Sequence, residues 1–321
     1  MISKNIDEAV KILENNQLVA IPTETVYGLA GNAFSDKAIT SIFNLKKRPL
    51  FNPLIVHIQS INKLSEVAQN IPKDAILLAE KFWPGPLTLV LPKKDYISNL
   101  VTAGKDTVAV RVPNHSLTLQ LLGKLSFPLV APSANPFTSI SPTTPQHVNR
   151  YFKDQLPLIL DGGACQHGIE STIVGFENEC PVLYRLGALS VEEIETCIGK
   201  PLQFSKTKDK RPQAPGMLFK HYAPSTPTFL VNSLQDEVQF IASKDNLKIG
   251  LLRFKELSPN VNPEYQEILT ATGDLNEAAK NLYAALHRLD HLGLDIILAE
   301  KLPSEGLGIT LNDKLKRASN K

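Results

Sequence analysis

Three consecutive cations and two prolines stand directly before an apolar run in residues 45–57, LKKRPLFNPLIVH, of this 321-residue chain. Basic residues at the end of a helix favour its negative C-terminal pole, and a proline then stops the helix. Alternatively, if Pro49 ends the helix, Lys46 and Arg48 can turn toward one cleft, although residues two apart cannot share a helical face. The second arrangement would place two positive charges where they can bind an anion. The stretch by itself leaves both interpretations open.

Polar side chains also accompany the strands that this stretch introduces. Asn52 precedes the run LIVHI, and His57 lies within it. A histidine in such a strand is either a core residue with a satisfied hydrogen bond or a ligand-binding group. Arg111 lies in the middle of the strand-like segment VAVRVP. A buried arginine needs a partner, and its planar fork suits a carboxylate or a phosphate.

The segment IPTETVYGLAG (21–31) places hydroxyls and one carboxylate between a strand and two glycines. Ligand sites of open α/β sheets tend to lie at such strand edges. Thr23, Glu24 and Thr25 are, however, good turn residues, so the segment by itself predicts a turn.

A second loop, APSANPFTSISPTT (131–144), contains Ser133, Asn135 and Ser141. Hydroxyl and amide groups of this kind suit phosphate oxygens or sugar hydroxyls. A plain loop of serine, asparagine and proline would have the same composition, so the loop alone does not establish a site.

The segment LDGGACQHGIESTIVGF (160–176) combines paired glycines with Ser171 at the start of a strand, and Arg185 follows in LYRLGALS. Glycines let backbone amides approach an anion closely. The chain has no G-x-x-x-x-G-K-[ST] loop, and the sequence shows no catalytic triad or metal-ligand cluster. Cations, hydroxyls and glycine-rich turns around one sheet therefore favour binding of a phosphoanhydride over acid–base hydrolysis of a neutral substrate.

Composition places the chain among ordinary soluble globular proteins, with 43% hydrophobic and 21% charged residues. The net charge of +2 creates no global field for a polyanion, so phosphate binding must depend on local clusters. Residues 1–16 read as an amphipathic helix, and no apolar stretch is long enough to span a bilayer, so we expect a cytoplasmic protein without membrane contact. Cys165, Cys180 and Cys197 lack paired spacing and are expected to be free thiols.

Apolar runs alternate with helical patterns over the first part of the chain. Alternation of this kind predicts a layered α/β domain with a largely buried sheet. The expected strands are residues 18–21, 54–58, 87–91, 108–112, 128–132, 157–160 and 171–176. The expected helices are residues 5–15, 36–46, 60–69, 73–82, 115–124 and 145–153.

A change of composition near Ser205 predicts a domain boundary, because the residues that follow are charged and rich in proline and have few periodic apolar positions. We expect a first domain over residues 1–204, a linker over 205–227 and a small α/β domain over 228–321, and the chain length also suits two domains. The elements expected in the small domain are strands at 228–231, 248–254 and 295–299 and helices at 234–243, 275–292 and 307–317.

The linker embeds apolar and aromatic residues in the segment MLFKHYAP, which a disordered tether would not usually contain. One interpretation is that Met217, Phe219, His221 and Tyr222 staple the two domains together. The other is that the linker folds across a site in the first domain, with Tyr222 reaching a ligand.

In their order along the chain, these motifs resemble one known family. PTETVYGLA, the K-x-R-P of Lys46 to Pro49, NPLIVH, WPGPLTLVL, APSAN, SPT and GIESTIV follow one another as in the YrdC-like threonylcarbamoyl-AMP synthases. The linker PGMLFKHYAP resembles that of the long, two-domain form of the family. The resemblance implies an α/β fold with a YrdC-like twisted, mixed open sheet flanked by helices, followed by a small C-terminal Rossmann-like βαβ domain.

The resemblance implies a nucleotidyltransferase that joins L-threonine, bicarbonate and ATP into threonylcarbamoyl-AMP and releases pyrophosphate, with Mg²⁺ accompanying the ATP. This product would supply the N6-threonylcarbamoyl group of tRNA through a threonylcarbamoyl-transferase partner. Carbamates hydrolyse readily, so a lid formed by the linker would protect the intermediate from water.

The resemblance also implies roles for individual residues. Lys46 and Arg48 would form the catalytic basic motif. The residues implied to hold threonine are Thr25, His57, Arg111 and Ser171. The residues implied to hold the nucleotide are Arg48, Asn52, Thr107, Ser133, Ser141, Arg185 and Tyr222. One departure is that Asn135-Pro-Phe-Thr138 stands where many members have a glycine after the SAN motif.

Two other functions remain to be weighed. An RNA-binding module of the same fold would need basic residues spread over its surface and would bind with steep salt dependence. A related carbamoyl-transfer domain that acts on carbamoyl phosphate would normally accompany zinc-finger-like cysteine motifs, and this sequence has none.

Overall fold

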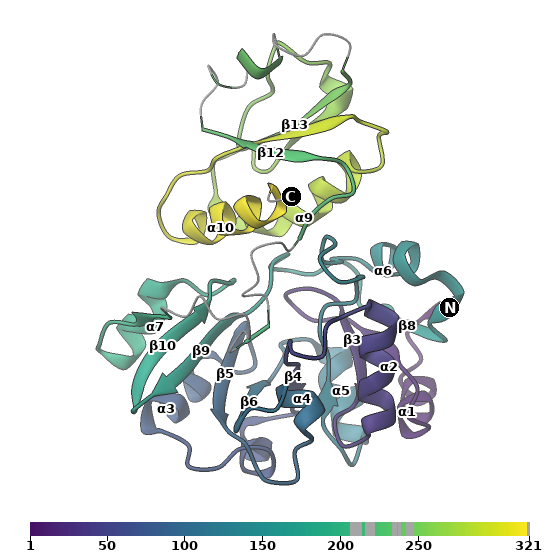
Figure 1. The fold of residues 1–321 in the computed structure, drawn as a ribbon, viewed down its shortest axis with the longest axis vertical. Coiled ribbons are helices and arrows are strands. Elements are labelled where there is room, and N and C mark those ends of the chain that lie inside the picture. The colour runs from purple at the N-terminus through teal and green to yellow at the C-terminus, as the bar shows by residue number, and fades with distance from the viewer. Residues whose placement is uncertain (206–213, 216–221, 233–235, 237–238, 242–246, 320–321) are drawn as a thin grey trace. The chain divides into compact units, whose positions relative to one another are not determined.

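The computed structural model describes residues 1–205, 214–215, 222–232, 236, 239–241 and 247–319. The chain divides into two compact units (Figure 1). The first unit consists of Met1–Phe137, Pro142–Gln166 and Glu170–Leu218, and the second consists of Thr138–Ser141, His167–Ile169 and Phe219–Lys321. Linker residues Met217, Phe219 and His221 lie outside the described residues, as does most of the helix expected over 234–243.

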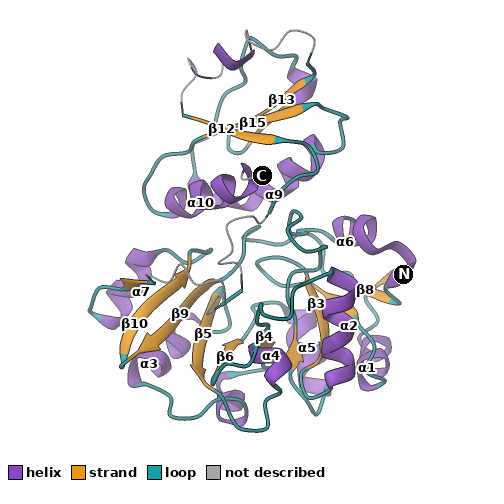
Figure 2. Ribbon diagram, viewed as in Figure 1, coloured by secondary structure: helices purple, strands orange, loops and turns teal. Residues whose placement is uncertain are grey.

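Within the described residues, the first unit is built on an 11-stranded sheet in the order β1-β8-β2-β3-β7-β4-β6-β5-β9-β10-β11 (Figure 2). Its strands are β1 (Ile2–Ser3), β2 (Val19–Ile21), β3 (Gly28–Asn32), β4 (Ile55–His57), β5 (Leu87–Pro92), β6 (Thr107–Arg111), β7 (Leu129–Val130), β8 (Leu158–Leu160), β9 (Thr172–Glu177), β10 (Cys180–Arg185) and β11 (Gln203–Phe204). Parallel pairs such as β4 with β6 and antiparallel pairs such as β5 with β6 make the sheet mixed, as expected.

Helices connect these strands. They are α1 (Ile6–Glu14), α2 (Asp36–Lys46), α3 (Lys73–Phe82), α4 (Asn99–Thr102), α5 (Ser116–Lys124), α6 (Pro145–Phe152) and α7 (Val191–Ile198), with short 3₁₀ helices η1 (Ile61–Glu66) and η2 (Lys153–Gln155). Some helices begin at a side chain that accepts a hydrogen bond from a backbone amide of the first turn. Ser35 caps α2 in this way, and Ser190 forms a capping box at α7.

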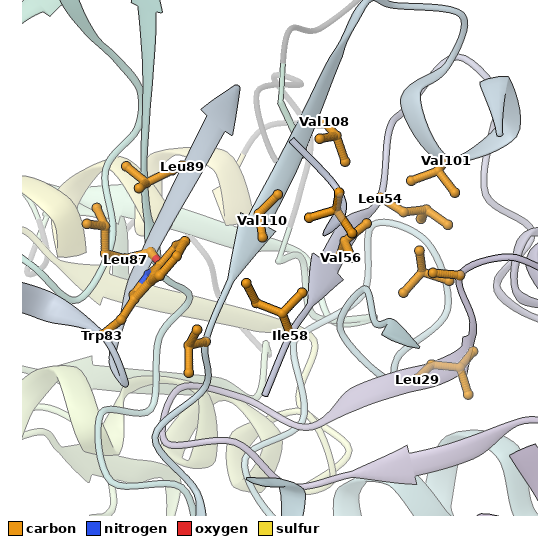
Figure 3. Close-up of a cluster of buried hydrophobic side chains, with 14 of the residues drawn as sticks. Leu29, Leu54, Val56, Ile58, Trp83, Leu87, Leu89, Val101, Val108 and Val110 are labelled. Carbon is orange, nitrogen blue, oxygen red and sulfur yellow. The ribbon is translucent and has the colours of Figure 1, made fainter. Parts of the chain in front are cut away.

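One face of the central strands is buried against a large apolar core (Figure 3). The side chains of Val56 in β4, Val108 and Val110 in β6, and Leu87 and Leu89 in β5 belong to this core. Because side chains alternate across a strand, the residues between them must extend from the opposite face. Those intervening residues include several of the polar side chains singled out by the sequence.

Most expected elements of the first unit are confirmed, and the exceptions have physical reasons. The helix expected over 60–69 is wrong in type, because the chain forms the 3₁₀ helix η1, in which Leu64 is the buried residue. Strand β3 was not expected, since its sequence GLAGN has weak strand propensity. Strand β10 was also not expected, because a proline interrupts its apolar pattern.

The second unit contains, within its described part, a parallel sheet in the order β12-β15-β13-β14. Its strands are β12 (Thr228–Val231), β13 (Ile249–Arg253), β14 (Gln266–Ile268) and β15 (Ile296–Glu300), and its helices are η3 (Pro263–Tyr265), α9 (Leu275–Leu289) and α10 (Leu307–Ser319). Helices α9 and α10 lie on the same side of this sheet (Figure 2). The expected βαβ-type architecture is confirmed, and in the part of the chain that is described every helix is too short or too polar to cross a membrane.

Candidate functional site

Several of the predicted polar residues extend from the face of the central sheet opposite the large core. His57 and Arg111 are direct neighbours in the parallel pairing of β4 with β6, and both alternate with core residues. On the same face, Ile55, Val90, Ala109 and Ile173 form a smaller apolar cluster. We call this surface of strands β4, β6, β5 and β9 the site face. It brings together residues that are far apart in the sequence.

Arg111 is paired with a carboxylate that the sequence interpretation treated only as part of a turn. Its Nη2 lies 2.6 Å from Oε1 of Glu24, and its Nε donates to the carbonyl of Gly85 at 3.3 Å. Oε2 of Glu24 accepts a hydrogen bond of 3.0 Å from the backbone amide of Asn114. Glu24 is 1% exposed and Arg111 4% exposed. A buried arginine needs an anionic partner, and this need is the signal that could have identified Glu24.

The loop that carries Glu24 is the turn that its residues predict. The hydroxyl of Thr23 accepts hydrogen bonds from the amides of Thr25 and Val26, both at 3.2 Å. The hydroxyls of Thr23 and Thr25 lie 2.8 Å apart, and both residues are buried. The turn thus holds Thr25 beside the acidic partner of Arg111.

A β-bulge brings Arg185 onto the site face. Leu183 belongs to the large core, and strict alternation would send Arg185 to the same side. The pairing of β9 with β10 shifts between these two residues, so that Arg185 lies opposite Ile173. Bulges commonly re-aim a side chain in this way beside functional sites.

Arg185 and Ser171 are directly bonded. Nη2 of Arg185 donates to the carbonyl of Ser171 at 2.8 Å and to its hydroxyl at 3.0 Å. The Ser171 hydroxyl also lies 2.7 Å from that of Thr88 on β5, which alternates with core residues. Nη1 of Arg185 donates to the carbonyl of Pro215 at 3.2 Å. Because Ala214 packs into the small apolar cluster, linker residues 214–215 lie over the site face.

His57 is uncharged in this environment. Burial, and secondarily the charge of Arg111, lower the pKa of His57 to about 3. Its Nδ1 lies 3.2 Å from the carbonyl of Ile55, so the core-histidine interpretation is correct in that the ring has a hydrogen-bond partner. When Nδ1 carries the proton, Nε2 is an acceptor that suits a hydroxyl group of a ligand.

Lys46 is fully buried and braces the loop after β7. Its Nζ donates to the carbonyls of Ser133 and Asn135, both at 2.5 Å, and its own carbonyl accepts from the amide of Phe137 at 2.8 Å. Burial, with the nearby charge of Arg48 as a smaller cause, lowers the pKa of Lys46 well below its usual value. Helix α2 ends at Lys46 because Lys47 takes the left-handed conformation. The helix therefore stops before it reaches Pro49, the residue that the sequence suggested would end it.

Arg48 closes the loop that leads into β4. Its Nε and Nη2 donate to the carbonyls of Asn52 at 3.2 Å and Pro53 at 2.8 Å. Asn52 has a side chain with 0% exposure, and among the described residues neither of its amide atoms has a hydrogen-bond partner. Unpaired buried polar groups are costly and rare, so this amide is a candidate ligand contact. Thr107 begins β6, so it lies about 13 Å along the strand from Arg111.

The two remaining predicted residues belong to the second unit. The carbonyl of Ser141 accepts a hydrogen bond of 3.2 Å from Nε2 of His287. Tyr222 is buried, has a positive φ of 64°, and stacks on Tyr283 with 5.6 Å between ring centroids. Nζ of Lys314 donates to the Tyr222 hydroxyl at 3.2 Å. Ten of the predicted residues thus lie in the first unit, and Ser141 and Tyr222 lie in the second.

The described part of the chain shows no cluster of three or more histidine, cysteine or acidic side chains suited to a metal ion. Cys165, Cys180 and Cys197 are free, as expected. The chemistry available to the site face thus comes from cations, hydroxyls and an amide, with one buried carboxylate beside Arg111.

Two family models match the chain. One, described as "Telomere recombination", matches residues 11–187, and the other, described as "Threonylcarbamoyl-AMP synthase, C-terminal domain", matches residues 189–320. The chain belongs to the threonylcarbamoyl-AMP synthase family. It is therefore a member of a family of enzymes, and the family that the motifs predicted is confirmed.

Other members of the family are similar over nearly their whole length. The threonylcarbamoyl-AMP synthase of Pyrococcus abyssi is 40% identical over 97% of this chain and 93% of its own, and that of Bacillus subtilis is 37% identical over 98% and 92%. The crystal structure of P. abyssi Sua5 complexed with L-threonine matches with a TM-score of 0.91 and 37% identity, covering 99% of this chain and 97% of that one. These matches confirm the two-domain form and the fold class.

Proposed function

We propose that this protein forms threonylcarbamoyl-AMP and pyrophosphate from L-threonine, bicarbonate and ATP. The observation that carries the proposal is the convergence of Arg111, Arg185 and Ser171 on one face of the sheet, in a chain of this family. Such an arrangement provides two guanidinium groups beside hydroxyls, which suits a substrate carboxylate next to a phosphate. That a relative of this fold was crystallised with L-threonine supports the choice of amino acid.

In the proposed reaction, Arg111 pairs with the threonine carboxylate at the C-terminal end of β6. His57 and Ser171 lie on the same face and offer an acceptor nitrogen and a hydroxyl to the rest of the substrate, and Thr25 lies on the adjoining turn. Bicarbonate would give carbon dioxide and hydroxide, and the threonine amine, made neutral by loss of one proton to solvent, would attack the carbon dioxide. The second proton, lost as the carbon–nitrogen bond forms, would combine with the hydroxide to give water. The resulting carbamate is an anion, so the nearby cations favour its formation.

The nucleotide would occupy the other end of the site face. Asn52 presents its unpaired amide there, Thr107 begins β6, and Arg48 closes the adjoining loop. A carbamate oxygen would attack the α-phosphorus of ATP, forming the new oxygen–phosphorus bond as the bond to the pyrophosphate leaving group breaks. Positive charge from the basic residues offsets charge on the phosphates. The residues proposed for this role are Lys46, Arg48 and Arg185, with Ser133, Ser141 and Tyr222 as further nucleotide contacts.

Mg²⁺ would enter with the triphosphate and offset its charge, since the described side chains form no metal site of their own. We further propose that the product is handed to a transferase that modifies tRNA, and that the protein works in the cytoplasm, where ATP and tRNA are available. Linker residues 214–215, which lie over the site face, would help to keep water from the carbamate.

The test is an incubation of the full-length protein with ATP, bicarbonate and L-threonine, omitting each in turn, with pyrophosphate measured. Pyrophosphate release should require all three. Arg111→Ala should abolish the threonine-dependent release. Because this change leaves the buried Glu24 carboxylate without its cation, the variant is assayed under conditions in which its circular dichroism spectrum shows that it is folded. The proposal would be refuted if pyrophosphate release did not depend on threonine, or if the unaltered protein released no pyrophosphate. Tight, steeply salt-dependent RNA binding without pyrophosphate release would instead support the RNA-binding alternative.

A further inference from the structure

Glu24 has so far been described only as the buried partner of Arg111. Its carboxylate is held at both oxygens, by Nη2 of Arg111 at 2.6 Å and by the backbone amide of Asn114 at 3.0 Å. The amide anchor does not depend on Arg111. The Glu24 carboxylate would therefore stay in place if the Arg111 guanidinium directed some of its N–H groups toward a substrate.

The charges around this pair cancel. Glu24 neutralises Arg111, and His57 on the neighbouring strand is uncharged because burial lowers its pKa. The thiol of Cys165 also stays protonated, since burial and the charge of Glu24 raise its pKa. A simple carboxylate entering this environment would place two anions on one guanidinium, with like charges close together. A zwitterion would bring a positive group for Glu24 along with the negative group for Arg111.

We propose that Glu24 receives the α-amino group of the amino-acid substrate while Arg111 receives its α-carboxylate. The inference rests on the proposed function, which supplies L-threonine as the substrate. Threonine binds as the ammonium, whose hydrogen bond to the carboxylate is charge-assisted. It loses one proton before it attacks carbon dioxide, and the neutral amine can still donate to Glu24. The pair thus selects a zwitterionic α-amino acid over an α-hydroxy acid of the same shape.

The test compares two ligands on two proteins by isothermal titration calorimetry of the full chain. L-threonine and (2S,3R)-2,3-dihydroxybutanoate differ in an amino group replaced by a hydroxyl. The unaltered protein should bind threonine at least about 30-fold more tightly than the hydroxy acid. Glu24→Gln should weaken threonine binding by about tenfold or more and change binding of the hydroxy acid by less than about threefold.

An equal loss for both ligands in Glu24→Gln would overturn the proposal, because Glu24 would then act only by holding Arg111. If that variant does not fold, binding to the unaltered protein still tests the proposal. Similar affinities for the two ligands would show that no residue, Glu24 included, distinguishes the amino group from a hydroxyl. Glu66→Gln is the matched control, because the Glu66 carboxylate pairs with Lys63 at the exposed surface. Threonine binding without pyrophosphate release would refute the proposed function alone and leave this test intact.

Discussion

Replacing Asn52 by leucine should raise the thermal stability of the ligand-free protein and weaken its use of ATP. The side chain has 0% exposure, and both of its amide atoms lack a hydrogen-bond partner among the described residues. Each buried, unsatisfied polar atom costs about 1–3 kcal/mol. Leucine has nearly the same shape and removes both atoms, so taking the low end for each atom gives a gain of about 2 kcal/mol. The melting temperature should then rise by about 4–8 °C for a unit of this size.

The same change removes the amide that we assign to ATP, so the KM for ATP should rise by about 10–100-fold. Thermal unfolding without ligand and pyrophosphate release at varied ATP measure the two effects. Asn312→Leu is the control, because the Asn312 side chain exchanges two hydrogen bonds of 2.9 Å with the backbone of Leu302, and its loss should lower the melting temperature. If Asn52→Leu is also destabilised, or binds ATP normally, then Asn52 is not an amide kept unpaired for a ligand.

Three further predictions follow from buried groups. Lowering the pH from 6.5 to 5.5 should lower the free energy of unfolding by about 1 kcal/mol through His57, because the unfolded side chain takes up a proton that the folded one, with a pKa of about 3, does not. In urea unfolding, the free energy of His57→Gln should depend less steeply on pH than that of the unaltered protein. An unchanged dependence would contradict this. Lys46→Met should speed amide hydrogen exchange around Ser133, since it removes two bonds to backbone carbonyls there, and unchanged exchange would exclude Lys46 as a brace. In the second unit, a double-mutant cycle of Lys314→Met with Tyr222→Phe, measured as free energies of unfolding, should give a coupling energy of about 0.5–1.5 kcal/mol. A coupling energy of zero would mean that the 3.2 Å hydrogen bond between the two side chains does not stabilise the protein.

Much of the fold could be predicted because the apolar runs are long enough to show their period. Strands β4, β5 and β6 lie within a residue or so of the runs that predicted them, since their alternating core residues are all large and apolar. Strand β14, with the sequence QEI, has no such signal, because it is three residues long and pairs on one side only. Short edge strands are defined by their neighbours, which a local pattern does not contain.

The sequence singled out the polar residues proposed for the site, but it did not show how these residues are held. Resemblance singled out Arg111 and Arg185, yet the orientation of Arg185 depends on a bulge that alternation alone would have missed. The pairing of Arg111 with Glu24 joins residues from distant parts of the chain, and a local interpretation saw only a turn. The assignment of residues 138–141 to the second unit likewise depends on tertiary contacts.

The cations beside the site face are held in two different ways. Arg185 donates to the backbone carbonyl and to the hydroxyl of Ser171, and these groups orient its charge without neutralising it. Arg111 is instead paired with the carboxylate of Glu24. A cation oriented by dipoles keeps its full charge for a polyanion, whereas a neutral ion pair favours a neutral zwitterion. Under the proposed function, Arg185 should therefore attract a phosphate of ATP, and the pair of Arg111 with Glu24 should receive the amino acid.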